Sequence, residues 1–183
     1  IIDRIVKTSG ELKLGEDMGA VISAAARERI TGMIDEAEKQ GAKIVLDGRN
    51  LQVPEGYDGG YWLGPTIIDY ASPEMACAQV EIFGPVLTIL RARSLQEAMK
   101  IENGSPYGNA ASVFTTSGSV SRYVSENVSA GMVGINVGVP VPRDPFSFGG
   151  WNKSKFGHGD ITGTSGLSFW TNLRKVTTRW SVP

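Results

Sequence analysis

Strand-like and helix-like segments alternate in the second half of the chain, and this alternation constrains the fold more than any other feature of the sequence. Runs of apolar and β-branched residues at 86–92, 111–116 and 132–137 are typical of buried strands. Between them, residues 94–97 (Ser-Leu-Gln-Glu) form a capping box that opens one helix, and an apolar stripe over 120–128 marks another. A strand–helix–strand–helix–strand order predicts an α/β fold built on a parallel sheet.

The first 70 residues predict one further helix and two further strands. The helix is expected to begin after Ser23, which can cap it, and to end at Gly41. Its apolar residues recur at helical spacing, at Ile30, Met33, Ile34 and Ala37. Strands are expected at 43–46 and 65–70. Residues 47–64, rich in Gly, Asp and aromatic side chains, are expected to form an exposed excursion between them.

Two segments follow the last predicted strand. The first is a long loop, residues 138–163, rich in glycine and aromatic residues. Connections beyond the carboxyl ends of parallel strands usually carry binding residues, so we expect this loop to carry function. The second is the tail, residues 167–179, in which aromatic residues alternate on both faces in a strand-like way. With no obvious neighbour within the chain, this tail predicts a strand that pairs with another chain.

Composition excludes several classes of function. The chain has 183 residues and a formal charge of -1, so a nucleic-acid partner is not expected. Its apolar runs are short, and no membrane-spanning segment is expected. One Cys and one His cannot build a disulfide framework or a zinc site, so we expect no metal and a reducing compartment. The opening "IIDRIVKTSG" lacks an initiator Met and any leader, and we expect the chain to be a piece of a longer one.

Six segments resemble, in this order, the carboxyl-terminal part of the aldehyde dehydrogenase superfamily: "LGPTII", "EIFGPV", "PYGNAASVFTT", "AGMVGINV", "FSFGGWNKSKFG" and the tail. Within it, "NVGVPVPRDPFSFGGWNKSKFG" is most similar to the methylmalonate-semialdehyde dehydrogenase branch, which acylates CoA. The resemblance implies a partial parallel-sheet catalytic domain over 1–165 and a C-terminal oligomerisation strand over 166–183, used for a dimer or tetramer. It also implies a cytoplasmic location, or the mitochondrial matrix in a eukaryote.

The resemblance assigns roles to several side chains. In the family, the Glu of "EIFGPV" accepts hydrogen bonds from the nicotinamide ribose of NAD and the Phe packs beside it; here these are Glu81 and Phe83. Relatives often carry an acid where this chain has Val80, which leaves the role of Glu81 unaffected. Phe148 matches an aromatic residue that lines the aldehyde pocket, and Phe146 is expected to shape the same wall.

Three other residues are weighed and set aside. Cys77 matches no nucleophile sequence of the family and is expected to be a small buried hydrophobe. His158 has no paired Ser or Cys and is expected in a solvated loop; "GHGDITG" around it has neither the spacing nor the preceding strand of a dinucleotide fingerprint. Arg143 could bind a substrate carboxylate, but the resemblance places the arginines for that role upstream.

The implied reaction uses a Cys nucleophile and a general-base Glu that both lie upstream, so no catalytic residue is assigned within the chain. The Cys attacks a short carboxylated semialdehyde, NAD takes a hydride, and CoA removes the acyl group from the thioester. Two alternatives stay open, a related dehydrogenase that uses water instead of CoA and a non-catalytic assembly fragment. In either case the chain alone is expected to be inactive.

Overall fold

A computed structural model describes residues 1–53, 55–143 and 145–180 of the chain. The chain divides into two compact units, unit 1 over Ile1–Ser94 and unit 2 over Leu95–Pro183, and each is described by itself. None of the helices in the described ranges is long and apolar enough to cross a lipid bilayer.

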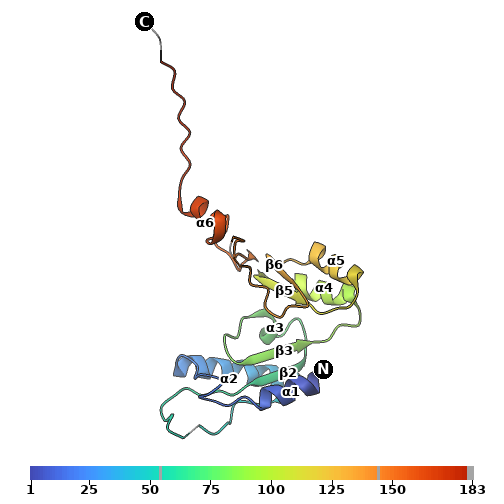
Figure 1. The fold of residues 1–183 in the computed structure, drawn as a ribbon. Helices are drawn as coiled ribbons and strands as arrows, with labels where there is room; N and C mark the ends of the chain where they lie inside the picture. Colours follow the sequence, from blue (N-terminus) through green and yellow to red (C-terminus); the bar gives the residue numbers. More distant parts are fainter. Residues whose placement is uncertain (54, 144, 181–183) are drawn as a thin grey trace. The chain divides into compact units, whose positions relative to one another are not determined.

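Unit 1 is a three-stranded mixed sheet with helices packed against it (Figure 1). The strand order is β1-β2-β3, with β1 antiparallel and β3 parallel to the central strand β2. Its elements are α1 (Ile2–Gly10), α2 (Ala24–Lys39), β1 (Lys43–Leu46), β2 (Thr66–Ala71), α3 (Ala76–Gln79) and β3 (Val86–Leu90).

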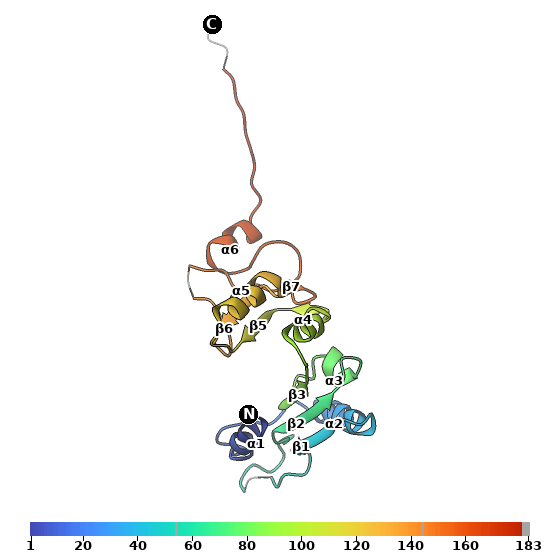
Figure 2. The same cartoon turned by 90° about the vertical axis from the view of Figure 1, so that its right-hand side faces the viewer.

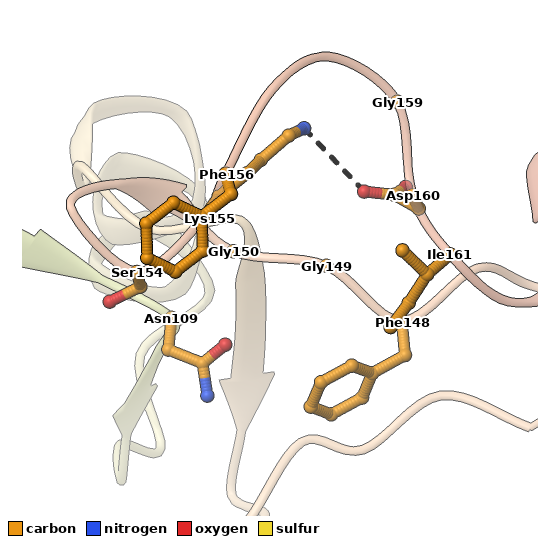
Figure 3. Close-up of a pocket in the computed structure, with 10 residues that line it drawn as sticks. All are labelled: Asn109, Phe148, Gly149, Gly150, Ser154, Lys155, Phe156, Gly159, Asp160 and Ile161. Carbon is orange, nitrogen blue, oxygen red and sulfur yellow. Dashed lines mark ion pairs between the residues drawn. The ribbon is translucent and has the colours of Figure 1, made fainter. Parts of the chain in front are cut away.

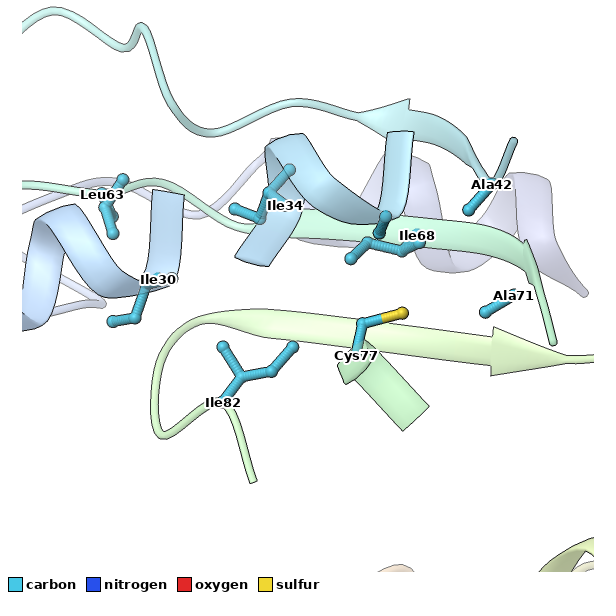
Figure 4. Packing of buried hydrophobic residues seen from close by; sticks show 9 residues of the cluster. Ile30, Ile34, Ala42, Leu63, Ile68, Ala71, Cys77 and Ile82 are labelled. Atoms are coloured by element: carbon cyan, nitrogen blue, oxygen red, sulfur yellow. The ribbon is translucent and has the colours of Figure 1, made fainter. Parts of the chain in front are cut away.

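Helix α2 forms where the sequence predicts it. The Ser23 side chain accepts a hydrogen bond from the Ala26 backbone N–H at 3.1 Å, which confirms the predicted cap. The predicted apolar stripe faces the core, where Ile30, Ile34 and Ala37 are buried. They pack with residues of β2, α3 and the segment before β3 in one cluster (Figure 4). This cluster fixes α2 against the sheet.

The excursion between β1 and β2 is only partly exposed, so the prediction for 47–64 needs correction at both ends. Gly48 is buried, and so are Trp62 and Leu63. Trp62 is held in place because its indole N–H donates to the Tyr57 carbonyl at 3.1 Å and its own carbonyl accepts from the Arg27 Nε at 3.0 Å. The aromatic residues that suggested a solvent loop therefore serve partly as anchors.

Unit 2 contains two small two-stranded sheets and three helices in the described ranges (Figure 2). Strands β5 and β6 are parallel and are joined through α5, while β4 and β7 are antiparallel. The elements are α4 (Leu95–Asn103), β4 (Tyr107–Gly108), β5 (Ala110–Val113), α5 (Gly118–Asn127), β6 (Met132–Ile135), β7 (Trp151–Asn152) and α6 (Gly163–Trp170).

The α/β class is confirmed, but the unit 1 sheet is mixed and the β4–β7 sheet is antiparallel, whereas the β5–β6 sheet is parallel. Parallel pairing is found for β2 with β3 and for β5 with β6. The antiparallel pairing of the predicted strand β1 was missed because periodicity identifies a strand but says nothing about its neighbour. The two-residue strands β4 and β7 were not predicted, and β7 lies in the segment that was expected to be a loop. A long irregular segment connects β1 to β2, whereas β5, α5 and β6 lie between β4 and β7 along the chain.

Strand β6 ends at Ile135, two residues earlier than predicted, because of Asn136. Its backbone adopts a left-handed conformation with φ of 57°, which Asn tolerates better than most residues. The Asn136 side-chain amide accepts from the Thr115 N–H at 2.8 Å and donates to the Thr115 carbonyl at 3.0 Å. The Asn136 side chain thus provides the hydrogen bonds to Thr115, just after β5, that the backbone of a longer β6 would otherwise provide.

The tail contradicts the predicted strand over its first four residues. Residues 167–170 belong to α6, and 171–180 have no regular secondary structure. A helix satisfies its own backbone hydrogen bonds, whereas a strand needs a neighbour, and none lies beside this segment in the described part of the chain. The Thr171 hydroxyl donates to the Leu167 carbonyl at 2.6 Å and closes the helix end.

Candidate functional site

A six-residue turn, residues 80–85, joins α3 to β3 and is called the 80–85 turn below. Its side chains are mostly exposed, and Ile82 is the one that is buried. Glu81 is exposed, Ile82 is 8% exposed and joins the core cluster, and Phe83 is 79% exposed. The Glu81 carboxylate forms no ion pair or hydrogen bond with another residue in the described ranges. Both acceptor oxygens of Glu81 are therefore open to a ligand.

The backbone of Phe83 is held in an unusual conformation. Its φ of 54° lies in the left-handed region, which costs an L-residue about 1–2 kcal/mol. The turn is tied to the start of the parallel pair, because the Thr66 N–H of β2 donates to the Pro85 carbonyl at 2.9 Å. Strained residues of this kind persist where the surrounding structure over-determines them, often at ligand sites. The conformation turns the Phe83 ring outward.

The exposed groups of the 80–85 turn suit a sugar ring. An ionised carboxylate only accepts hydrogen bonds, so Glu81 can hold two neighbouring hydroxyls. Phe83 offers an apolar face two residues away. These residues fit the ribose of a dinucleotide, the group that the sequence resemblance implies.

Unit 2 contains a cavity of about 210 Å³ in the loop after β6 (Figure 3). Phe148 lines this cavity, whereas Phe146, which is 72% exposed, does not. Polar groups share the wall, among them Asn109 and an ion pair between Lys155 and Asp160 at 3.6 Å. The cavity therefore combines an aromatic surface with a few polar atoms, as small-molecule sites usually do.

Two glycines allow the loop to fold closely around this cavity. A Cβ at Gly149 would overlap the Asp160 carboxylate, and a Cβ at Gly150 would lie 2.9 Å from the Asn109 Cα. The Phe148 N–H donates to the Thr162 hydroxyl at 2.8 Å, which ties the two arms of the loop together. The two glycines of "FSFGG" thus allow Asp160 and Asn109 to approach the loop backbone closely.

Cys77 is confirmed as a buried residue. It is 6% exposed and belongs to the unit 1 core, and burial raises the pKa of its thiol. A thiol with a raised pKa is a poor nucleophile. His158 lies exposed in the loop, as predicted, and Arg143 is exposed and outside the cavity lining.

Sequence reasoning missed a buried carboxylate at the other end of the unit 1 sheet. Asp69 is 2% exposed and accepts from Arg91 Nε at 3.1 Å and Nη2 at 2.6 Å, and from the Tyr70 N–H at 2.8 Å. The Arg91 guanidinium, with which it hydrogen-bonds, lowers the pKa of Asp69. Arg91 also lies over the Tyr70 ring, 4.2 Å from its centroid. The sequence signal that could have revealed this carboxylate is an Asp within an otherwise apolar predicted strand.

Asn109 is the cavity residue that sequence reasoning could have found. It stands immediately before β5, in a segment already quoted for its resemblance. Asn109 lies at the amino end of β5, whereas binding residues are expected beyond the carboxyl ends of parallel strands.

The comparisons with known proteins cover almost the whole chain. The model of the aldehyde dehydrogenase family matches residues 1–176. A malonate-semialdehyde dehydrogenase of Pseudomonas aeruginosa is 42% identical over 177 residues, which are 97% of this chain and 35% of that protein. A probable methylmalonate-semialdehyde/malonate-semialdehyde dehydrogenase, acylating and mitochondrial, of Drosophila melanogaster is 48% identical over 91% of this chain and 32% of that protein.

Solved structures give the same result. A putative methylmalonate-semialdehyde dehydrogenase from Sinorhizobium meliloti, complexed with NAD, superposes with a TM-score of 0.93 and 38% identity, over 100% of this chain and 38% of that one. The chain thus spans about a third of the length of the relatives that it matches. With the family model covering nearly every residue, the chain belongs to the aldehyde dehydrogenase family.

Proposed function

We propose that this chain is the carboxyl-terminal part of an NAD-dependent methylmalonate-semialdehyde dehydrogenase that acylates CoA. The observation that carries the proposal is the 80–85 turn, which presents an open carboxylate and an outward-facing aromatic ring. The names of the relatives support the substrate class, and the NAD complex of the Sinorhizobium protein supports the cofactor.

Glu81 holds the nicotinamide ribose and Phe83 packs beside it. When bound, NAD supplies the hydride acceptor of the reaction. The contribution of this chain is positional, because a ribose fixed by two hydrogen bonds cannot rotate away from the reacting carbon. The strained Phe83 backbone serves this purpose, since it needs no reorganisation when the cofactor arrives.

Phe148 and Phe146 form part of the wall of the aldehyde pocket. Phe148 lies in the cavity of unit 2, where an aromatic face excludes water from a short aldehyde. Phe146 lies outside that cavity, and its exposed ring is available to a substrate. The nucleophilic Cys and general-base Glu belong to the remainder of the enzyme, since Cys77 is buried in the core.

CoA is the proposed acyl acceptor, as the word "acylating" in the names of several relatives indicates for those proteins. The alternative is a related enzyme in which water releases the acid. Product analysis of the complete enzyme, with and without CoA, distinguishes them, because only the acylating enzyme yields an acyl-CoA.

The domain division proposed from the sequence keeps residues 1–165 as the partial catalytic domain and assigns 166–183 to self-association. Leu173, Val176 and Trp180 are strongly exposed in a segment without regular structure. Such a segment can add as a strand to a sheet edge of a second copy. A non-catalytic assembly role for the whole chain is the alternative that this same observation favours.

Substitution of Glu81 in the complete enzyme tests the cofactor role. Glu81→Gln keeps the shape and removes the charge, so the KM for NAD should rise about 10- to 150-fold, as expected for one charge-assisted hydrogen bond. The KM for the aldehyde should not change. Glu126→Gln, an exposed acid on α5, is the matched control. Unchanged affinity for NAD in Glu81→Gln would refute the ribose contact.

A further inference from the structure

We propose that Ile30 of α2 is a positioning residue for the 80–85 turn. Through direct contact with Gly84, it determines how far the turn projects from the sheet. The inference rests on the proposed function, because the turn carries Glu81 and Phe83. Ile30 does not touch the ligand-facing side of the turn; it supports the turn from the core side.

The contact between Gly84 and Ile30 leaves no room for a side chain. A Cβ at Gly84 would lie 2.6 Å from Ile30 Cδ1, 3.1 Å from Cγ1 and 3.2 Å from Cγ2. Carbon atoms pack at about 3.5–4.0 Å, so all three distances are too short. Gly84 does not have a positive φ. A glycine is therefore required at this position because the Ile30 side chain lies so close, and not because of the backbone conformation.

Ile30 cannot easily move away from this contact. It is 0% exposed and packs in the core cluster with Ile34 and Ile68 (Figure 4). Its branched Cβ also restricts rotation about χ1 in a helix. Close-packed interiors transmit a displacement rather than absorb it. A change at Ile30 should consequently appear as a shift of the turn.

Phe83 is held between two fixed neighbours. Ile82 is anchored in the core cluster, and Gly84 lies against Ile30. The left-handed backbone of Phe83 bridges these two points and leaves its ring outside. The core thus maintains the strained conformation, and Ile30 determines how far the turn, with Glu81 and Phe83, stands out from the sheet.

A set of five variants of this chain tests the contact. Ile30→Val removes only Cδ1, the atom nearest to Gly84, and Ile34→Val makes the same change one turn along α2 at a site that is 1% exposed. The others are Gly84→Ala alone and Gly84→Ala combined with each valine substitution. The first readout is the NMR coupling constant and chemical shift of the Phe83 backbone, which report its φ directly.

Ile30→Val should shift the Phe83 signals, whereas Ile34→Val should leave them unchanged at a similar loss of melting temperature. Gly84→Ala should displace Phe83 from the left-handed region. Adding Ile30→Val should move the Phe83 signals part of the way back, because the shortest of the three overlaps is removed, and adding Ile34→Val should not. Equal effects of Ile30→Val and Ile34→Val, alone and combined with Gly84→Ala, would overturn the inference.

The second readout is kinetic and uses the complete dehydrogenase. Gly84→Ala should raise the KM for NAD about tenfold or more, since small misplacements at a positioned ligand are costly. Adding Ile30→Val to Gly84→Ala should reverse part of this loss, while the KM for the aldehyde stays constant throughout. If the Phe83 signals follow Ile30 but the KM for NAD never changes, the positioning contact stands and the proposed cofactor role of the turn fails.

Discussion

Unit 1 and unit 2 differ in how they support their candidate sites. Among the described residues, the core cluster of unit 1 joins nine buried side chains from helices, strands and the 80–85 turn, whereas that of unit 2 joins four. Unit 2 also leaves several large apolar side chains exposed, namely Phe114, Val139, Phe146, Phe156, Leu167 and Trp170. A rigid core can hold a strained turn in place, while an exposed apolar loop indicates a surface that another protein surface covers.

This difference predicts that the chain needs its tail for assembly but not for the fold of unit 1. Deletion of residues 166–183 should convert an oligomer into a monomer or an aggregating species, because it removes the exposed apolar side chains through which the tail would contact a second copy. Sedimentation of the chain with and without the tail measures this effect, the largest that we expect. Monomeric behaviour of both forms would show that the tail folds back on its own unit.

The second prediction compares the two cores directly. Ile68→Ala in unit 1 and Met99→Ala in unit 2 both truncate a buried side chain, a change that costs about 2–5 kcal/mol. Ile68 is fully buried at the centre of its cluster, whereas Met99 lines a surface groove, where the structure can relax. The cost should therefore lie near the upper end of this range for Ile68 and near the lower end for Met99.

Hydrogen exchange measured by mass spectrometry assigns each loss to its unit. Peptides from 1–94 should lose protection in Ile68→Ala, and peptides from 95–180 in Met99→Ala. Equal losses in the two variants would mean that the small cluster of unit 2 is as tightly packed as the core of unit 1.

Features that depend on neighbouring residues in the chain were predicted well. The cap at Ser23 and the buried stripe of α2 follow from spacing alone, and the structure confirms both. The burial of Cys77 also agrees, because a lone Cys outside any nucleophile sequence is usually a core residue.

Features that depend on distant partners were not predicted. Asn136 ends a strand by bonding to Thr115, and the Trp62 carbonyl accepts from Arg27, 35 positions earlier; spacing along the chain contains no trace of either. The first turns of the tail became helical because no strand lies beside them in the described residues. The start of β3 at Val86 was predicted, but the support that Ile30 gives to the 80–85 turn before it depends on a contact between residues 54 positions apart.

A third prediction separates structure from chemistry at Cys77. Cys77→Ser places a hydroxyl in the unit 1 core and should cost about 1–3 kcal/mol of folding free energy. The chain alone should show no aldehyde oxidation with NAD, with or without CoA, in either form. Calorimetry and absorbance of NADH measure the two quantities. Turnover that Cys77→Ser abolishes would contradict the assignment of Cys77 to the core.

The last and smallest effect concerns acid. Because the folded state lowers the pKa of Asp69, its ion pair with Arg91 contributes stability that is fully present above the unfolded pKa of about 3.9 and is lost as the pH falls through the folded value. Melting temperatures between pH 7 and pH 3 should fall less steeply below pH ~4 in Asp69→Asn than in the unchanged chain. Asp47, whose pKa is lowered mainly by Arg49, is more exposed, so Asp47→Asn should change the slope less. If the melting temperature falls equally steeply with pH in all three proteins, the ion pair between Asp69 and Arg91 does not make the stability of unit 1 depend on pH.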